Sequence, residues 1–177
     1  LVQLPLPKKF NADKIIAAIA PKKDVDGFGS GARVTPGLNL GILKLTMSAR
    51  GNLRGKKSVI LAKSKELASS LRRLLAKKKI KSRLILPTDK KIGRITKQAD
   101  ILITALGKPN FIKASMIKKG AIVIDVGTSY KDGKVYGDVS DSAGKFALAI
   151  SPVPGGVGPL TVAMLFVNLI KLYKLQN

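Results

Sequence analysis

The sequence predicts an α/β fold in which a mostly parallel, Rossmann-like sheet carries helices on both faces. Three short runs, at residues 58–62, 99–106 and 121–127, are largely apolar and rich in β-branched side chains. Segments with helical periodicity separate them. Continuous apolar runs are typical of parallel strands buried on both faces, whereas half-exposed strands alternate apolar and polar residues. We place this domain at residues 35–170.

A smaller segment, residues 1–34, precedes this domain. Prolines among its first residues predict the end of a strand followed by a rigid turn. Asn11 or Asp13 is suited to cap a short helix, Lys14–Ala20, which the following proline ends. The Gly- and Pro-rich stretch at 29–37 is the predicted boundary between the two parts of the chain.

The elements of the larger domain follow from the spacing of apolar residues. In segment 65–79, Leu67, Leu71, Leu74 and Leu75 recur at helical spacing and define one apolar face. The other expected elements, in chain order, are a helix at 39–47, strands at 58–62 and 82–86, a short helix at 92–98, a strand at 99–106, a helical turn at 115–119, a strand at 121–127, an edge strand or hairpin at 134–139, a strand at 146–150 and a helix from Leu160.

The composition excludes several kinds of chemistry. The 177 residues include no cysteine and no histidine, so disulfides, thiolate zinc sites and a histidine base are excluded, and acid–base work falls to Lys, Asp, Glu or Tyr. We predict no metal site. No apolar run reaches the length of a membrane helix and no secretion signal is evident, which predicts a cytoplasmic protein. The first residue is not Met, so we expect further sequence upstream.

The charge is high and uneven. The formal net charge is +23, and residues 61–120 alone hold 17 basic and 3 acidic residues. Such a field suits an anionic small molecule or nucleic acid. A lysine-rich proteome would produce the same excess without a function, and aromatic residues are few and no nucleic-acid-binding motif is present. Both interpretations stay open.

A strand, a Pro-Val-Pro turn, three glycines and an apolar helix follow one another between Ala149 and Ile170. Glycines let backbone N–H groups approach a ligand closely, and a helix N-terminus favours negative charge. The pattern alone fits either a phosphate-binding turn or a tight packing turn.

The motif PVPGGVGPLTVAML, at 152–165, resembles the C-terminal signature of the bifunctional methylenetetrahydrofolate dehydrogenase/cyclohydrolase family. Three more segments resemble that family in the same order: VQLPLP at 2–7, KDVDGF at 23–28, and GAIVIDVG with GDV at 120–127 and 137–139. The resemblance implies a folate one-carbon enzyme that oxidises methylenetetrahydrofolate with NADP and hydrolyses the methenyl product.

The same resemblance implies an organisation. Residues 1–34 would be the remnant of an N-terminal α/β folate domain, 35–170 the dinucleotide-binding domain, and 160–177 a helix that packs back on the first part. A homodimer formed through the cofactor domain is also implied, with segment 134–139 near the interface.

The resemblance further assigns site residues. Gln3 and Asp26 would hold the pterin ring and are the candidate catalytic residues. The folate set is Val2, Gln3, Leu4, Asp26, Pro152, Val153, Pro154, Gly155 and Gly156. The cofactor set is Ala62, Lys63, Ser64 and Thr128.

Two departures from the family pattern leave more than one hypothesis for the function. The first βα turn, LAKSKELASS at 61–70, has no glycine where the family has Gly-Arg-Ser, so side chains stand in the usual pyrophosphate path. Relatives also carry a Tyr and a general acid–base Lys upstream of VQLPLP, and no residue here aligns with them. The alternatives are an active enzyme, a relative that retains only the cyclohydrolase step, or a degenerate relative that binds folate or RNA as a structural subunit.

Overall fold

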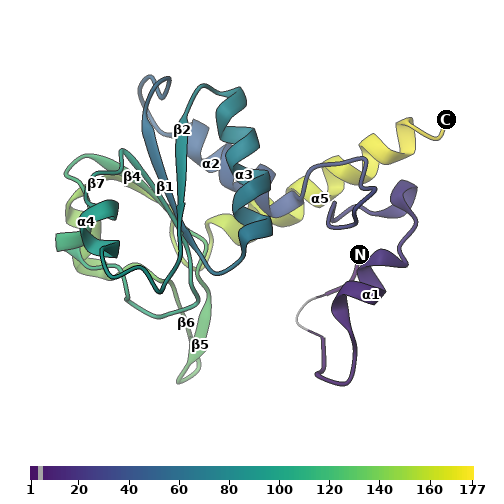
Figure 1. Cartoon of the computed structure of the whole chain (residues 1–177), viewed down its shortest axis with the longest axis horizontal. Coiled ribbons are helices and arrows are strands. Elements are labelled where there is room, and N and C mark those ends of the chain that lie inside the picture. The colour runs from purple at the N-terminus through teal and green to yellow at the C-terminus, as the bar shows by residue number, and fades with distance from the viewer. Residues whose placement is uncertain (4–5) are drawn as a thin grey trace.

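The computed structural model describes residues 1–3 and 6–177, and its centre is a parallel sheet. Within the described residues this sheet has five strands in the order β2-β1-β3-β4-β7, and every neighbouring pair is parallel (Figure 1). The strands are β1 (Lys57–Ala62), β2 (Lys81–Ile85), β3 (Ile101–Ala105), β4 (Ala121–Asp125) and β7 (Ala147–Ile150). The predicted parallel α/β sheet is confirmed.

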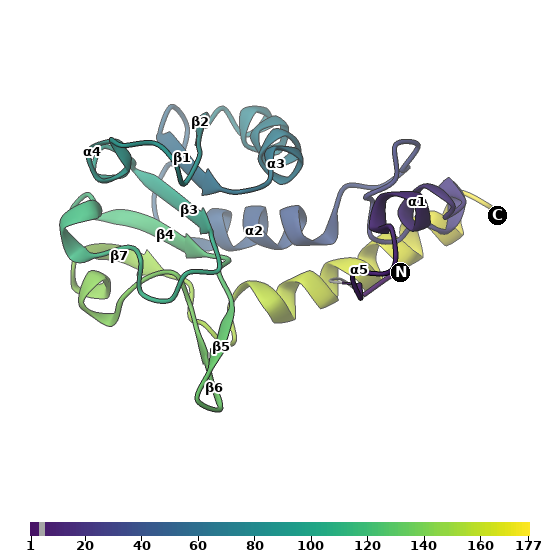
Figure 2. The ribbon, with the colours of Figure 1, turned by 60° about the horizontal axis from the view of Figure 1, so that its bottom comes forward.

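Helices cover both faces, as the sequence predicted. Ile60 of β1 points to one core and its neighbours Val59 and Leu61 point to the other, because successive side chains of a strand alternate. On the first face Leu71 and Leu75 of α3 complete the core, together with α2 and α5 (Figure 2). The helices on this face are α2 (Gly37–Ser48), α3 (Lys65–Lys77) and α5 (Val157–Lys174). The other face carries α4 (Ile92–Thr96) and the 3-10 turns η2 (Ala114–Met116) and η3 (Asp141–Lys145).

The helices α2 and α5 approach closely because glycines line their contact. A Cβ atom on Gly41 would lie 3.2 Å from the backbone nitrogen of Thr161, and one on Gly37 would lie 3.1 Å from the side chain of Leu165. Such distances leave no room for a larger side chain, so the two glycines set the separation of the helices.

The segment before α2 lies apart from the sheet, beside the far half of α5 (Figures 1 and 2). It contains α1 (Ala12–Ala17), capped by the Asn11 side chain, which accepts a 3.0 Å hydrogen bond from the Lys14 N–H, and η1 (Pro21–Lys23). The predicted short helix is confirmed with slightly earlier bounds. The predicted strand end is wrong for the described residues 1–3 and 6–7, which have no strand.

Three other predictions need adjustment. The helical turn expected at 115–119 is the shorter η2. The edge segment at 134–139 forms a hairpin only in part, because β5 (Ser129–Lys131) pairs antiparallel with β6 (Lys134–Tyr136). The last helix begins at Val157 although Pro159 follows, since a proline in the first turn of a helix costs no hydrogen bond.

With 18 residues, α5 could by length and composition cross a membrane, although the sequence analysis expected no apolar run of that length. Only 17% of it is buried in the described structure. Its Asn168 side chain is nevertheless buried and donates hydrogen bonds to the carbonyl oxygens of Val25 and Thr35, both at 2.9 Å. A buried amide bound to two loop carbonyls indicates that this helix packs on the N-terminal segment.

Candidate functional site

The carboxyl ends of β1 and β3 form the point where the strand order reverses. β1 pairs with β2 on one side and with β3 on the other, and Ala62 stands opposite Ala105. In open α/β sheets, ligands bind in the crevice beyond the strand ends at such a point. The turns that follow, Lys63–Ser64 after β1 and Leu106–Lys108 after β3, therefore border the expected crevice.

The first turn of α3 is capped by the chain itself. The Ser64 hydroxyl accepts a hydrogen bond from the Leu67 N–H at 3.1 Å and donates one to the Glu66 carboxylate at 2.9 Å. Hydrogen bonds from its own backbone N–H and from Ser64 lower the pKa of Glu66. The helix N-terminus, which attracts anions, already has a carboxylate in place, and the exposed Lys63 stands beside it.

Two buried carboxylates brace the loops behind this crevice. Asp125, at the end of β4, accepts hydrogen bonds from three backbone N–H groups in segment 127–139, at 2.9 to 3.1 Å. Asp138 accepts from the Thr104 hydroxyl and from two backbone N–H groups in loop 106–108, at 2.6 to 2.9 Å. Burial raises the pKa of Asp125 to about 6, although its hydrogen bonds oppose the rise. The carboxylates thus fix the β3 loop and the hairpin segment to the sheet.

A cavity of about 480 Å³ opens at the carboxyl ends of β4 and β7. Its lining includes Asp125, Ser151 and the first residues of the turn 152–156. The Ser151 hydroxyl accepts a 2.8 Å hydrogen bond from the Asp125 N–H and so joins the two strands. The turn requires glycine: Gly155 has a φ of +103°, and a Cβ on Gly156 would lie 2.5 Å from the backbone oxygen of the first residue of the turn.

Asp26 is one of two buried acids of the N-terminal segment, with Asp24. Its carboxylate accepts a hydrogen bond from the Val2 N–H at 3.3 Å, which brings the first residues of the chain to this loop. Burial raises the pKa of Asp26, and the Val2 bond opposes the rise. The neighbouring Asp24 accepts from the N–H groups of Gly27 and Gly29 at 2.9 and 2.8 Å, and this fixes the loop that follows Asp26.

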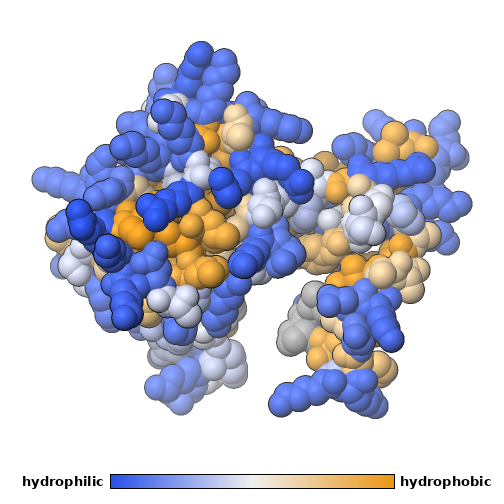
Figure 3. Space-filling view, viewed as in Figure 1, coloured by the Kyte–Doolittle hydropathy of each residue, from blue (hydrophilic) through white to orange (hydrophobic). Residues whose placement is uncertain are grey.

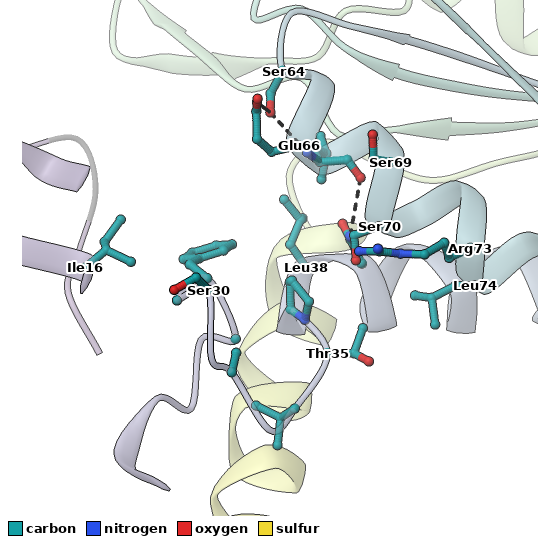
Figure 4. Close-up of a pocket in the computed structure, with 18 of the residues that line it drawn as sticks. Ile16, Ser30, Thr35, Leu38, Ser64, Glu66, Ser69, Ser70, Arg73 and Leu74 are labelled. Atoms are coloured by element: carbon teal, nitrogen blue, oxygen red, sulfur yellow. Dashed lines mark hydrogen bonds between the residues drawn. The ribbon is translucent and has the colours of Figure 1, made fainter. Parts of the chain in front are cut away.

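A cleft of about 1010 Å³ separates this loop from α3. Gly27–Ser30 line one side, and Ser64–Leu67 and Arg73 line the other. Figure 4 shows Ser30 and Ile16 across the opening from Ser64 and Glu66. The loop of the predicted folate site and the turn of the predicted cofactor site therefore face each other across one cleft, whose size is within the range of ligand-binding sites.

Comparison with known proteins agrees with this arrangement. Residues 36–177 match the family model of the tetrahydrofolate dehydrogenase/cyclohydrolase NAD(P)-binding domain. This chain belongs to that family. It is 44% identical to the bifunctional protein FolD of Bordetella bronchiseptica over 97% of the chain, and 41% identical to that of Acetivibrio thermocellus over 99%.

Solved structures of the family show the same fold. The FolD enzyme of Campylobacter jejuni superposes with a TM-score of 0.90 at 35% identity, and that of Trypanosoma brucei, solved with NADP and an inhibitor, with 0.91 at 30% identity. Each comparison covers 99% of this chain and 66% of the other chain. The chain likewise spans 64% and 66% of the lengths of the two curated relatives named above.

The structure places the family's predicted folate residues in two groups. Val2 and Gln3 lie next to Asp26 through the Val2 hydrogen bond. Pro152 and Val153 line the 480 Å³ cavity, whereas Val2, Gln3 and Asp26 line neither that cavity nor the cleft beside α3, which the following residues Gly27–Ser30 line. Gly156 precedes α5, and Asn168 on α5 contacts the loop that contains Asp26; the two residues are about 18 Å apart along the helix axis. Leu4 lies outside the described residues.

The predicted cofactor residues gather at one edge of the sheet. Ala62 is buried at the end of β1, Lys63 and Ser64 are exposed just beyond it, and Thr128 follows β4. A Cβ atom on Gly107 would lie 3.7 Å from the backbone oxygen of Thr128, which places Thr128 beside the β3 turn. The roles of these residues stay predictions.

Sequence reasoning missed two parts of the site. The sequence analysis gave no role to the turn 106–108, although a glycine directly after a buried strand, here Gly107, can indicate a ligand-binding turn. Glu66 was not singled out either, although an acid two residues after Ser64 fits the first turn of a helix. The pair Asp125 and Asp138 belonged to the quoted motifs but received no role.

Proposed function

We propose that this chain carries out the NADP-dependent step of the family, oxidation of methylenetetrahydrofolate to the methenyl form, and that the full protein also hydrolyses the product to formyltetrahydrofolate. The observation that supports it is the shared cleft: the loop after Asp26 and the turn after β1 line opposite sides of one cavity. Two substrates held on facing walls satisfy the proximity that hydride transfer requires.

The residues at the switch point fit NADP. NADP held there would supply the hydride acceptor for the folate methylene group. Lys63 supplies a positive charge, and Ser64, with the N-terminus of α3, supplies donors for phosphate groups. Thr128 and the turn 106–108 border the crevice from the other side, where Asp138 fixes the backbone.

At the folate end, the chain orients the substrate with Asp26 and Gln3. A carboxylate pairs with the amino and amide donors of a pterin ring, and an amide side chain can pair with the ring through two hydrogen bonds. Burial of Asp26 strengthens such bonds, because water does not compete for the carboxylate. The turn 152–156 would contact a more distant part of an extended folate, since its first residues, Pro152 and Val153, line the other cavity.

A second candidate function is binding without oxidation. The observation that favours it is the Glu66 carboxylate on the first turn of α3, whose negative charge lies where a phosphate of the dinucleotide would bind. In this case the chain binds folate and has little affinity for NADP. A relative that performs only the cyclohydrolase step is the third option, and it depends on a lysine outside this chain.

We also propose a cytoplasmic homodimer. β7 is an edge strand of the sheet; Leu148 and Ile150 on it are 60% and 39% exposed, and Phe146 just before it is 46% exposed. An apolar edge strand without a neighbour is a surface that a second copy can cover. Within each copy, the division into residues 1–34 and 35–170 fits a family-model match that begins at residue 36.

The test is NADP and folate binding with matched variants of the full protein. We expect NADP to bind, Lys63→Ala to weaken NADP binding about tenfold with little effect on folate, and Asp26→Asn to do the reverse. Lys131→Ala and Asp132→Asn, on the exposed hairpin, are the charge-matched controls. Absence of NADP-dependent methenyl formation together with undiminished folate binding would select the second candidate.

A further inference from the structure

The amino-terminal ends of the sheet strands, opposite the carboxyl ends that border the proposed cofactor site, are strongly basic. Each strand of the five-stranded sheet is preceded by a turn that carries at least one exposed Lys or Arg. We call this set of turns the basic rim. Its basic residues are Arg50, Arg54, Lys56, Lys57, Lys77, Lys78, Lys79, Lys81, Lys97, Lys118, Lys119 and Lys145.

Hydrogen bonds join these turns into one continuous surface. The Gly55 N–H donates to the Lys79 carbonyl at 2.8 Å, and the Lys81 N–H to the Lys56 carbonyl at 2.9 Å. Other bonds connect Lys57 with Asp100, Asp100 with the start of β4, and Gly120 with Phe146 before β7. Since neighbouring strands lie about 4.8 Å apart, five strand ends give a rim about 20 Å long.

The charge differs sharply between the two edges. The entering turns, residues 50–57, 77–81, 97–100, 118–120 and 145–146, hold twelve basic residues and one acid. The segments that follow the strands at their carboxyl ends hold seven basic residues and five acids; they are residues 62–66, 86–91, 105–109, 125–140 and 151–156. A lysine-rich composition alone would raise both edges alike, so the excess of the entering turns calls for a separate explanation.

The rim also contains a cavity of about 350 Å³. Arg50, Lys56, Lys118 and Lys119 line it together with Asp100. The Lys118 ammonium lies 2.6 Å from the Asp100 carboxylate, so the one acid of the rim is already paired. The remaining cations have no carboxylate partner among the described residues.

We infer that the basic rim binds the phosphate backbone of nucleic acid. Its length matches about six phosphates of one strand at 3.4 Å each. Figure 3 shows hydrophilic side chains projecting from the upper end of the molecule, where the α2–β1 loop and the α3–β2 turn lie (Figure 1). Among the rim turns Phe146 is the single aromatic residue, so bases find almost no stacking surface and binding is independent of sequence.

An anionic membrane is the competing partner for a basic surface. Membrane association adds apolar side chains that enter the headgroup region to the electrostatic attraction. Around the rim, the exposed apolar side chains are Phe146 and Leu148, at the start of β7. In the turns before β1 and β2, the only long side chains that are exposed belong to Lys and Arg. The rim therefore favours a partner that offers a row of charges without an apolar layer.

The experiment measures binding of the full protein to a fluorescent 20-base-pair duplex of arbitrary sequence, by anisotropy at several salt concentrations. The rim variant replaces four lysines with glutamine: Lys56, Lys79, Lys81 and Lys119. The control variant makes the same change in charge far from the rim: Lys131, Lys134, Lys171 and Lys174. We expect the rim variant to lose at least tenfold in affinity and the control less than threefold.

The salt dependence gives a second, independent readout. Each phosphate contact contributes about 0.9 to the slope of log K against log salt, so removal of four contacts should lower the slope by about 3 to 4. NADP binding by the rim variant should equal that of the unmodified protein, since the cofactor edge is opposite, and this shows that the variant is folded. Equal losses in both variants, or binding to phosphatidylserine vesicles but not to the duplex, would overturn the inference.

Discussion

The Asn168→Ala substitution should release the N-terminal segment from α5. Asn168 is buried on α5, and its amide donates to the carbonyl oxygens of Val25 and Thr35, both at 2.9 Å. Val25 directly precedes Asp26, and Thr35 directly precedes Pro36, the N-cap residue of α2. One side chain thus holds both ends of the loop that lines the cleft opposite α3.

The magnitude follows from the two bonds. Each buried hydrogen bond contributes about 1 kcal/mol net, and a carbonyl left without a donor costs a further 1 kcal/mol or more. Val25 and Thr35 are half-buried, so water can partly replace the amide once the loop moves. We expect a loss of about 2 to 4 kcal/mol in the free energy that holds residues 24–35 in place, with a smaller effect on unfolding of the sheet.

Hydrogen–deuterium exchange separates these two effects. In Asn168→Ala, amides of residues 24–35 should exchange about 30- to 1000-fold faster, while those of β1 and β3 keep their protection. Folate affinity should fall and NADP affinity should change little. The control is Gln176→Ala, just beyond the end of α5, which removes an exposed 3.1 Å hydrogen bond to the Lys22 carbonyl and should change exchange only slightly. Unchanged protection at 24–35 in Asn168→Ala would refute the proposed role.

Three further predictions concern the carboxyl edge of the sheet. Glu66→Gln removes a negative charge from the first turn of α3 and should raise NADP affinity about threefold at low salt, less at high salt; equal affinity in titration calorimetry would contradict this. The raised pKa of Asp125 favours its protonated form in the fold, so the stability it contributes is present below about pH 4 and lost as the pH rises through about 6. The unfolding free energy of the wild type relative to Asp125→Asn should therefore fall by about 2 to 3 kcal/mol between pH 4 and pH 7.5 in urea titrations. Gly127→Ala places a methyl group inside a buried carboxylate and should lower the melting temperature by more than 5 °C, whereas Gly144→Ala, with open space at its Cβ, should leave it within 2 °C.

The periodicity of apolar residues was sufficient to predict the sheet and its helices. Buried strands read as continuous apolar runs, and α3 showed its apolar face through Leu71 and Leu75, because burial selects side chains position by position. The prediction of a strand end among the first residues was wrong for a related reason. A strand pairs its backbone groups with those of a neighbouring strand, whereas the Val2 N–H donates to the Asp26 side chain.

The site was less predictable, because its geometry depends on contacts between distant residues. The motifs predicted that Gln3 and Asp26 lie together, but no spacing indicates that Asn168 holds their loop 18 Å from the turn at 152–156. Likewise, Thr104 and Asp138 are 34 positions apart, and their hydrogen bond exists only because β3 and β4 are neighbours in the sheet. Local sequence specifies elements, whereas strand order decides which loops meet.

The glycine-free turn after β1 takes on a different meaning in the structure. Glycine would let a pyrophosphate approach the α3 N-terminus, whereas here Ser64 and Glu66 satisfy that terminus with their own side chains. This cap stabilises the helix, but it weakens the attraction of the helix N-terminus for phosphate. Lys63 then carries most of the charge available to a dinucleotide at this turn. If NADP binds as proposed, Glu66 must yield its place or share it, so cofactor affinity here should depend on salt more strongly than in relatives whose backbone makes the contact.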